Sequence, residues 1–290
     1  MKLRDIIIGE LPPLPPFPAV LQRVLELIED PRSSAADLVG VIQYDQSITS
    51  NVLRVCNSAY FALRQPVKSL REAVVRIGFN QLLEIVVSHS TGALFLHQVK
   101  GYDMETDGLW RHSVACALLA QIVGPRVTRE DTPAQFTAAL LHDIGKNFLH
   151  TFVHAHIGEI QRRVREEKRS FAEAEKEVLG LDHTEIGEEI TRRWNFPSVL
   201  VSGIRYHHMP LRAPSHDELV SLVHICDVVA RMTGMGGGTD ALAYPGEPAV
   251  MEKYNLKEKD LESFIAELGD RRSKIDLLLN ASRGGAAAQA

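Results

Sequence analysis

The stretch LLHDIGK at residues 140–146 places a histidine and an aspartate side by side within an apolar run. An ionised carboxylate in apolar surroundings is unstable unless a cation or hydrogen-bond donors compensate it, so Asp143 needs a partner. Asp227 poses the same problem, because the helical segment LVSLVHICDVVARM is apolar around nearly its whole circumference. We therefore expect both aspartates to lie inside the protein, each beside a group that makes its burial tolerable.

A second His-Asp pair, His216-Asp217, provides an internal control for this interpretation. It lies in PSHDE, where Ser215 and Glu218 have the spacing of a capping box at a helix start. This pair is therefore predicted to be a solvated helix terminus rather than part of a site.

Histidines on other predicted helices extend the candidate site. All twelve histidines fall in the middle of the chain, with none in the first 88 residues or the last 66. His112 interrupts LWRHSVACALLA, His183 opens HTEIGEEI, and His207 and His208 end SVLVSGIRYHH. Neutral imidazole and carboxylate are the ligands expected for zinc, iron or manganese, and the set contains no cysteine. The pattern predicts a mixed nitrogen and oxygen metal site, with a hydrogen-bonded polar core that holds no metal as the alternative.

The elements that must position these residues all have the spacing of helices. The first helical pattern stops at Asp30-Pro31, and Ser33 or Ser34 and then Asp45 can cap the next two helices. Further helical patterns occupy residues 69–77, 79–98, 108–123, 133–149, 154–168, 170–179, 183–194, 197–207, 215–233, 249–255 and 257–280. No convincing strand pattern is present, so the predicted fold class is all-α.

Three segments are predicted to lie outside regular helices. LPPLPPFP at residues 11–18 has too many prolines for a helix and is predicted to be an extended lead-in that packs on the next helix. The alternative is a docking peptide for a proline-recognising partner. GMGGGT at 234–239 is predicted to be a flexible break, and SRGGAAAQA at 282–290 a disordered tail.

Composition limits the classes of partner. The 290 residues are 45% hydrophobic with a formal net charge of −5, which provides no general attraction for nucleic acid or an anionic membrane. The segment 45–61 loosely resembles a helix-turn-helix, but Arg54 is its only cationic side chain, so DNA binding is not expected. The three cysteines are far apart and no stretch is long and apolar enough to span a bilayer, so a cytoplasmic protein is expected.

The chain order of the candidate residues resembles a known superfamily. The order H…HD…D is similar to that of the HD superfamily of metal-dependent phosphohydrolases, and here it comprises His112, His142, Asp143 and Asp227. His183 and His207 or His208 resemble the additional histidines that recruit a second metal in the HD-GYP branch, and Lys146 in HDIGK also matches that branch. The GYP signature itself is absent after His208, so hydrolysis of cyclic di-GMP is not expected.

A more specific resemblance covers residues 11 to about 232. The segments LPPLPPFPAVLQRVLELI, IQYDQSITSNVLRVCNSAYF and LREAVVRIGFNQLLEIVV resemble the HDOD family, an all-helical output domain of bacterial signalling proteins. The resemblance implies an N-terminal helical part at residues 1–100 packed on an HD-type helical core with the metal site at 101–233. A Gly-rich linker and a C-terminal helical tail would follow at 234–290.

The resemblance also implies a divalent metal centre, with iron or manganese as the first expectation and zinc as the alternative. One ion would be held by His112, His142, Asp143 and Asp227. A second ion, bridged by Asp143, would be held by His183 and His207, with His208 either a ligand or a support for one. A mononuclear centre is equally open.

Two functions are compatible with these residues. The first is a regulatory signal-transduction protein that acts through contacts with signalling proteins. The alternative is an active metal-dependent phosphohydrolase or phosphodiesterase acting on a nucleotide or another phosphate-containing small molecule. In that case Asp143 would be catalytic. Lys146, on the same helical face, would contact a phosphate oxygen unless it is a solvated helix residue.

Overall fold

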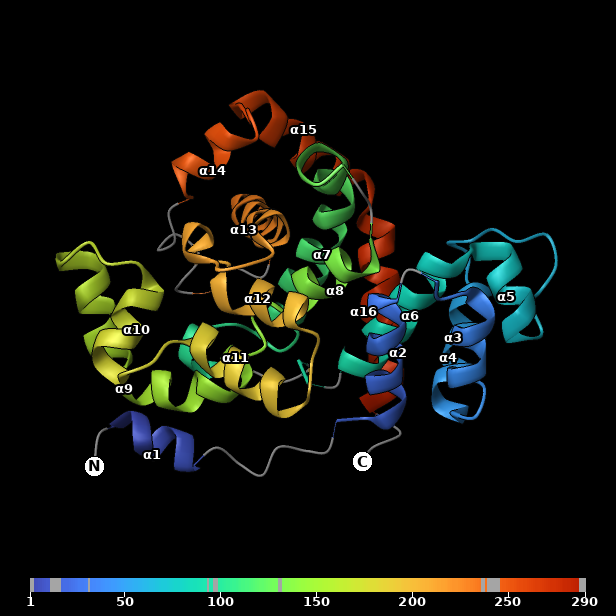
Figure 1. The fold of residues 1–290 in the computed structure, drawn as a ribbon, viewed down its shortest axis with the longest axis horizontal. Coiled ribbons are helices and arrows are strands. Elements are labelled where there is room, and N and C mark those ends of the chain that lie inside the picture. The colour runs from blue at the N-terminus through green and yellow to red at the C-terminus, as the bar shows by residue number, and fades with distance from the viewer. Residues whose placement is uncertain are drawn as a thin grey trace.

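Helices form the regular structure of the described chain (Figure 1). The computed structural model describes residues 3–10, 17–30, 32–92, 94–95, 99–129, 132–235, 238 and 246–286. Within these ranges the only β feature is an isolated antiparallel bridge between Val99 and Met104. The all-α prediction is confirmed, whereas most of the predicted polyproline stretch falls outside the described residues.

The N-terminal part is built from short helices. They are α1 (Leu3–Glu10), α2 (Ala19–Glu29), α3 (Ala35–Ile42), α4 (Gln46–Cys56), α5 (Leu70–Ile77) and α6 (Phe79–Gly92). Ser34 caps α3 and Asp45 caps α4, as predicted, because each side chain accepts a hydrogen bond from a backbone N–H of the first turn. Helix α1 was not predicted; it is held by Ile7, whose side chain is fully buried. Helix α6 ends at Gly92, several residues before the predicted end at residue 98.

The middle of the chain, predicted to be an HD-type core, is also helical. Its elements are η1 (Lys100–Tyr102), α7 (Gly108–Val127), α8 (Pro133–Leu141), α9 (Lys146–Glu166), α10 (Phe171–Leu179), α11 (His183–Arg193), α12 (Ser198–Tyr206), η2 (Pro210–Arg212) and α13 (Asp217–Met232). Helices α7, α8 and α13 pack on one another near the centre of the molecule, and α12 lies against α8 and α11 (Figure 1). The core helices therefore bring together segments that are more than a hundred residues apart.

The predicted division between helices 133–149 and 154–168 is wrong. Helix α8 ends at Leu141 and α9 begins at Lys146 and continues to Glu166, so the break falls within HDIG. A Cβ atom at Gly145 would lie 1.8 Å from the carbonyl oxygen of His183 and 2.8 Å from the amide nitrogen of Gly187. The backbone at Gly145 thus lies directly against α11, and only glycine permits this close approach.

The control pair at His216-Asp217 is a solvated helix terminus, as predicted. Asp217 opens α13, and its side chain is 63% exposed with Nζ of Lys253 at 2.7 Å. The predicted capping box is absent, because His216 adopts a left-handed conformation (φ 58°) and no side chain caps the helix. The two His-Asp pairs therefore differ in burial.

The C-terminal segment packs on both other parts of the chain. It contains α14 (Pro248–Lys253), α15 (Glu258–Asp270) and α16 (Arg272–Ala286), so the single helix predicted at 257–280 is two helices. Helix α16 lies along α6 and α4 (Figure 1). Nζ of Lys274 is 2.8 Å from Oε2 of the buried Glu84. Since α16 reaches Ala286, the tail predicted to be disordered from residue 282 is helical at its start. The division of the chain at residues 100 and 233 stays a prediction.

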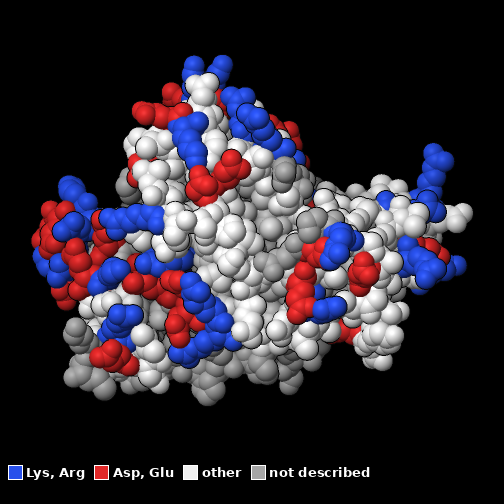
Figure 2. Space-filling model, viewed as in Figure 1, with Lys and Arg blue, Asp and Glu red and all other residues white. Residues whose placement is uncertain are grey.

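Charged side chains are distributed unevenly over the face shown in Figure 2. Over the region of α9 to α12, Lys and Arg are interspersed with Asp and Glu, and many form exposed ion pairs, such as Arg163 with Glu177 and Arg192 with Glu188. Such pairs contribute little to stability in water. Within the described residues, no helix is both long enough and apolar enough to cross a membrane.

Candidate metal centre

The HDIG turn places His142 and Asp143 at the centre of the molecule. Both side chains are fully buried, and His142 is the C-cap residue that follows α8. The close contact of Gly145 with the first turn of α11 brings His183 to the same place. The apolar run around the motif therefore reflects a buried turn between two helices, and Gly145 sets the distance from this turn to His183.

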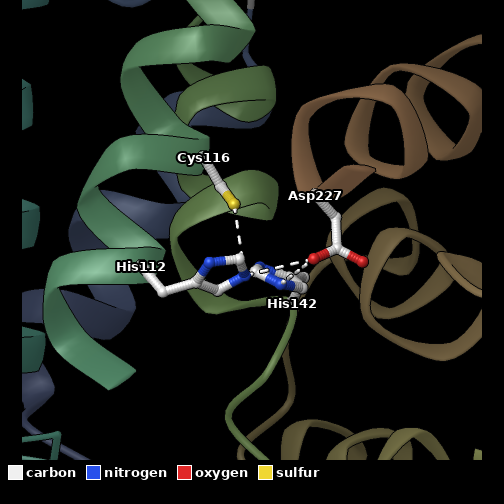
Figure 3. A group of neighbouring side chains, drawn as sticks. All are labelled: His112, Cys116, His142 and Asp227. Atoms are coloured by element: carbon white, nitrogen blue, oxygen red, sulfur yellow. Dashed lines mark hydrogen bonds and ion pairs between the residues drawn. The ribbon is translucent and has the colours of Figure 1, made fainter. Parts of the chain in front are cut away.

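A first ligand group consists of His112, Cys116, His142 and Asp227 (Figure 3). One potential ligand atom from each lies within 4.8 Å of the others, and all four residues are buried. His112 and Cys116 come from α7, His142 from the HDIG turn and Asp227 from α13. Nε2 of His112 is 3.1 Å from Oδ1 of Asp227, and Nε2 of His142 is 3.7 Å from the same oxygen. Sγ of Cys116 is 3.5 Å from Nε2 of His112.

A second ligand group consists of Asp143, His183, His207 and His208. Oδ1 of Asp143 lies 3.5 Å from Nε2 of His183 and 3.6 Å from Nε2 of His207. Nε2 of His208 is 3.1 Å from Nε2 of His183. His208 is the second residue after the end of α12, and its side chain is 8% exposed, whereas the other three are fully buried.

Asp143 joins the two ligand groups. Its Oδ2 is 3.3 Å from Nε2 of His142, while its Oδ1 faces His183 and His207. His208 also lies between the groups, because its Nδ1 is 3.6 Å from Oδ2 of Asp227. The structure thus brings together all the residues that the sequence singles out as metal ligands; their role as ligands stays a prediction.

Each buried aspartate has a cationic partner within the protein. Nζ of Lys146 is 2.8 Å from Oδ2 of Asp143, and Arg231 forms an ion pair with Oδ2 of Asp227. Burial alone would raise the pKa of Asp143, but the Lys146 ammonium holds it well below its usual range. Lys146 is itself buried, so it is not a solvated helix residue. The charge of the aspartates is therefore compensated without a metal ion, and their burial does not by itself require one.

The imidazoles provide the stronger indication of a metal. Nδ1 of His142 is 2.8 Å from the carbonyl oxygen of Ala139, and Nδ1 of His207 is 2.9 Å from that of Ile204. A carbonyl only accepts, so Nδ1 carries a proton in both rings, and in a neutral ring Nε2 then presents a lone pair. Neither Nε2 has a hydrogen-bond partner in the described part of the chain. Burial lowers the pKa of His207 to about 3, so this ring is neutral near pH 7.

The spacing of these atoms matches the donor set of a divalent cation. Ligands about 2.1 Å from a tetrahedral ion lie roughly 3.4 Å from one another. The corresponding separations here are 3.1 Å for His112–Asp227, 3.3 Å for His142–Asp143 and 3.5 Å for His183–Asp143. The chain therefore contains a buried His/Asp cluster that could hold a divalent metal.

Four residues at this site were not identified from the sequence: Tyr102, Cys116, Glu175 and Arg231. Cys116 and Arg231 could have been found, because each follows a candidate ligand by four residues on the same helix and so shares its face. Burial raises the pKa of the Cys116 thiol well above its usual value. Tyr102 and Glu175 have no comparable sequence signal.

Comparison with known proteins identifies similar sequences and folds. The sequence model of the HDOD domain family matches residues 14–210. An uncharacterised protein of Treponema pallidum is 25% identical over 236 residues, which cover 79% of this chain but only 44% of that protein. This chain thus spans less than half the length of that relative.

Three solved structures share the fold at low sequence identity. An HDOD domain protein of unknown function from Geobacter sulfurreducens has a TM-score of 0.72 at 24% identity, with 96% of each chain covered. A candidate signal transduction protein from Marinobacter aquaeolei has a TM-score of 0.76 at 22% identity, covering 98% of this chain and 62% of the other. A candidate phosphohydrolase from Shewanella amazonensis has a TM-score of 0.66 at 22% identity, covering 95% and 97%.

Proposed function

This chain belongs to the HDOD domain family, and on that premise we propose that it is a regulatory signal-transduction protein with an HD-type metal centre. Its two ligand groups would hold one or two divalent ions, with iron or manganese expected before zinc. Signalling proteins would reach it by direct contact. Tyr44 and Val75, which are 85% and 79% exposed, are apolar side chains that such a contact could cover.

The observation that carries this proposal is the pair of buried Nε2 lone pairs on His142 and His207. A buried acceptor without a donor costs about 1–3 kcal/mol, and the fixed Nδ1 protons prevent either ring from turning its donor inward. A metal ion in each ligand group would satisfy the acceptor of that group. When bound, such ions polarise phosphate oxygens and lower the pKa of a coordinated water. The residues that would hold them are the first and second ligand groups defined above.

Elemental analysis of protein purified without chelators tests this proposal. We expect one or two equivalents of a transition metal per chain, and loss of metal in His142→Ala and His207→Ala. His154→Ala is the matched control, because His154 is an exposed histidine on α9. A metal-free protein that does not take up iron, manganese or zinc on reconstitution would contradict the proposal.

An active phosphohydrolase is the second candidate function, and the position of Lys146 favours it. Its ammonium lies 2.8 Å from Asp143 Oδ2 inside the site, where a phosphate oxygen could become its partner. Solved proteins of similar fold include candidate phosphohydrolases from Shewanella amazonensis, which supports the choice of chemistry to test. Turnover of a phosphate-ester panel that is abolished by Lys146→Met, with metal content retained, would establish catalysis. A metal-loaded protein without turnover would leave the regulatory function.

A further inference from the structure

We propose that Glu175 and Tyr102 are positioning residues that orient His183 toward the metal and strengthen it as a ligand of the second ligand group. This inference rests on the proposed metal centre. It assigns a role to two fully buried polar side chains that belong to neither ligand group.

The contacts form a chain from tyrosine to carboxylate to imidazole. Oε2 of Glu175 is 2.6 Å from Nδ1 of His183 and 3.1 Å from the backbone nitrogen of the same residue. Oε1 of Glu175 accepts a hydrogen bond from the hydroxyl of Tyr102. A carboxylate oxygen accepts, so Nδ1 of His183 carries a proton, and in a neutral ring Nε2, which faces Asp143 and His208, keeps its lone pair.

This support differs from that of the neighbouring ligands. The Nδ1 atoms of His142 and His207 face neutral backbone carbonyls, whereas Nδ1 of His183 faces a carboxylate. A negative partner increases the electron density of the ring and its affinity for a cation, and the loss of such a partner typically weakens metal binding about 10–100-fold. His183 is therefore built to be the strongest imidazole donor of the second ligand group.

The surrounding packing fixes the position of Tyr102. A Cβ atom at Gly101 would lie 2.3 Å from the carbonyl oxygen of His150 and 2.8 Å from Cβ of Val153, so η1 rests directly on α9. The Tyr102 ring contacts Phe171 at the start of α10, with 5.6 Å between the ring centroids. Its face also lies 5.3 Å from Nζ of Lys146, the partner of Asp143. Tyr102 thus contacts the supports of both His183 and Asp143.

A purely structural role for Glu175 makes a different prediction. In Glu175→Gln the amide oxygen can still accept both hydrogen bonds from His183, and the amide nitrogen can donate to the Tyr102 oxygen. The shape and the number of hydrogen bonds are retained while the charge is removed. If the residue only fills space, this substitution should leave metal affinity unchanged.

The experiment is a calorimetric titration with Mn²⁺ of the chelator-treated protein, both the unmodified chain and its variants. His183→Ala identifies the ion held by the second ligand group. We expect Glu175→Gln to lower the affinity for that ion about 10–100-fold and to leave the affinity for the other ion unchanged. Tyr102→Phe should lower the same affinity, but less strongly. Glu177→Gln is the matched control, because this glutamate lies on the same helix and pairs with Arg163 and Arg169 at the surface.

The proton on Nδ1 of His183 gives a readout independent of metal. Its short hydrogen bond to a carboxylate should give a far-downfield proton resonance that Glu175→Gln abolishes and Glu177→Gln retains. If Glu175→Gln does not fold, Tyr102→Phe alone must lower the affinity of the same ion.

Two outcomes separate this inference from the proposed function. An unmodified protein that binds Mn²⁺ at the second ligand group, together with a folded Glu175→Gln variant of equal affinity, overturns the inference and leaves the metal centre intact. An unmodified protein that binds no Mn²⁺, Zn²⁺ or Fe²⁺ overturns the proposed function and the inference together.

Discussion

The two ligand groups differ in what holds their side chains in place. In the first ligand group, Asp227 is already engaged by His112 at 3.1 Å and by Arg231. In the second, His183 is held from outside by the carboxylate of Glu175 at 2.6 Å. Binding an ion requires the contacts of Asp227 to rearrange in the first group and the His183–His208 contact at 3.1 Å to open in the second, but the ring of His183 is already oriented by Glu175. We therefore expect the second ligand group to bind its ion more tightly.

Removal of the Asp143 carboxylate should have the largest effect on metal content, because this carboxylate contacts histidines of both ligand groups. Asp143→Ala is expected to release metal from both groups. It also leaves Lys146 buried without the partner at 2.8 Å, which should destabilise the fold by about 3–5 kcal/mol. Metal content and urea unfolding measure the two effects. Full metal content in this variant would show that Asp143 is not shared.

Single-ligand variants sharpen the comparison. His183→Ala should weaken binding of the tightly held ion, and His112→Ala should weaken binding of the weakly held ion. Each loss of affinity should exceed the roughly 10–100-fold expected when only an outer partner of a ligand is lost. Stepwise titration of each variant with Mn²⁺ distinguishes the two. If both substitutions weaken the same ion equally, the centre is mononuclear and the two groups act as one.

The stability of the metal-free protein should depend on pH through both groups. Burial lowers the pKa of His112 and of His207 to about 3, so between pH 6.5 and 3 the unfolded chain binds protons that the folded chain excludes. Stability is therefore complete above pH 6.5 and should fall by a few kcal/mol, to order of magnitude, as the pH decreases toward 3. Denaturant midpoints measured from pH 7 to pH 4 on chelator-treated protein test this. A midpoint that rises on acidification would contradict the burial of neutral rings.

Cys116 should have the smallest effect. Burial raises the pKa of its thiol, so the thiol stays protonated at neutral pH. The nearby carboxylate of Asp143 has a lowered pKa and is ionised, which makes it the better ligand for an ion in the first ligand group. Cys116→Ala is expected to retain both ions and to lose about 1 kcal/mol of stability through the small cavity it creates. Loss of the weakly held ion in this variant would place a thiolate in the first ligand group.

Most helices and the burial of His142, Asp143 and Asp227 could be predicted from the sequence, because both depend on local pattern. Helical spacing and capping residues such as Ser34 and Asp45 act within one or two turns, and a polar residue inside an apolar helix signals a buried site. The break at HDIG and the docking of α16 could not be predicted, since each depends on a contact with a distant segment.

The support for His183 was hidden for a related reason. Helix α10 has the sequence FAEAEKEVL, with Glu173, Glu175 and Glu177 at alternate positions. Glu173 caps the helix and Glu177 pairs with surface arginines, while Glu175 is buried against His183. Glu173 can be recognised by its capping-box spacing from Ser170, whereas Glu175 and Glu177 are equivalent in local sequence and only the packing of α10 on the core distinguishes them.

Anomalous diffraction from crystals of protein purified without chelators tests the central claim most directly. The account predicts a peak at the absorption edge of the bound metal among Asp143, His183 and His207, with the imidazole Nε2 atoms as ligands. Crystals without such a peak, in which Lys146 still bridges to Asp143 and water donates to Nε2 of His142 and His207, would contradict it.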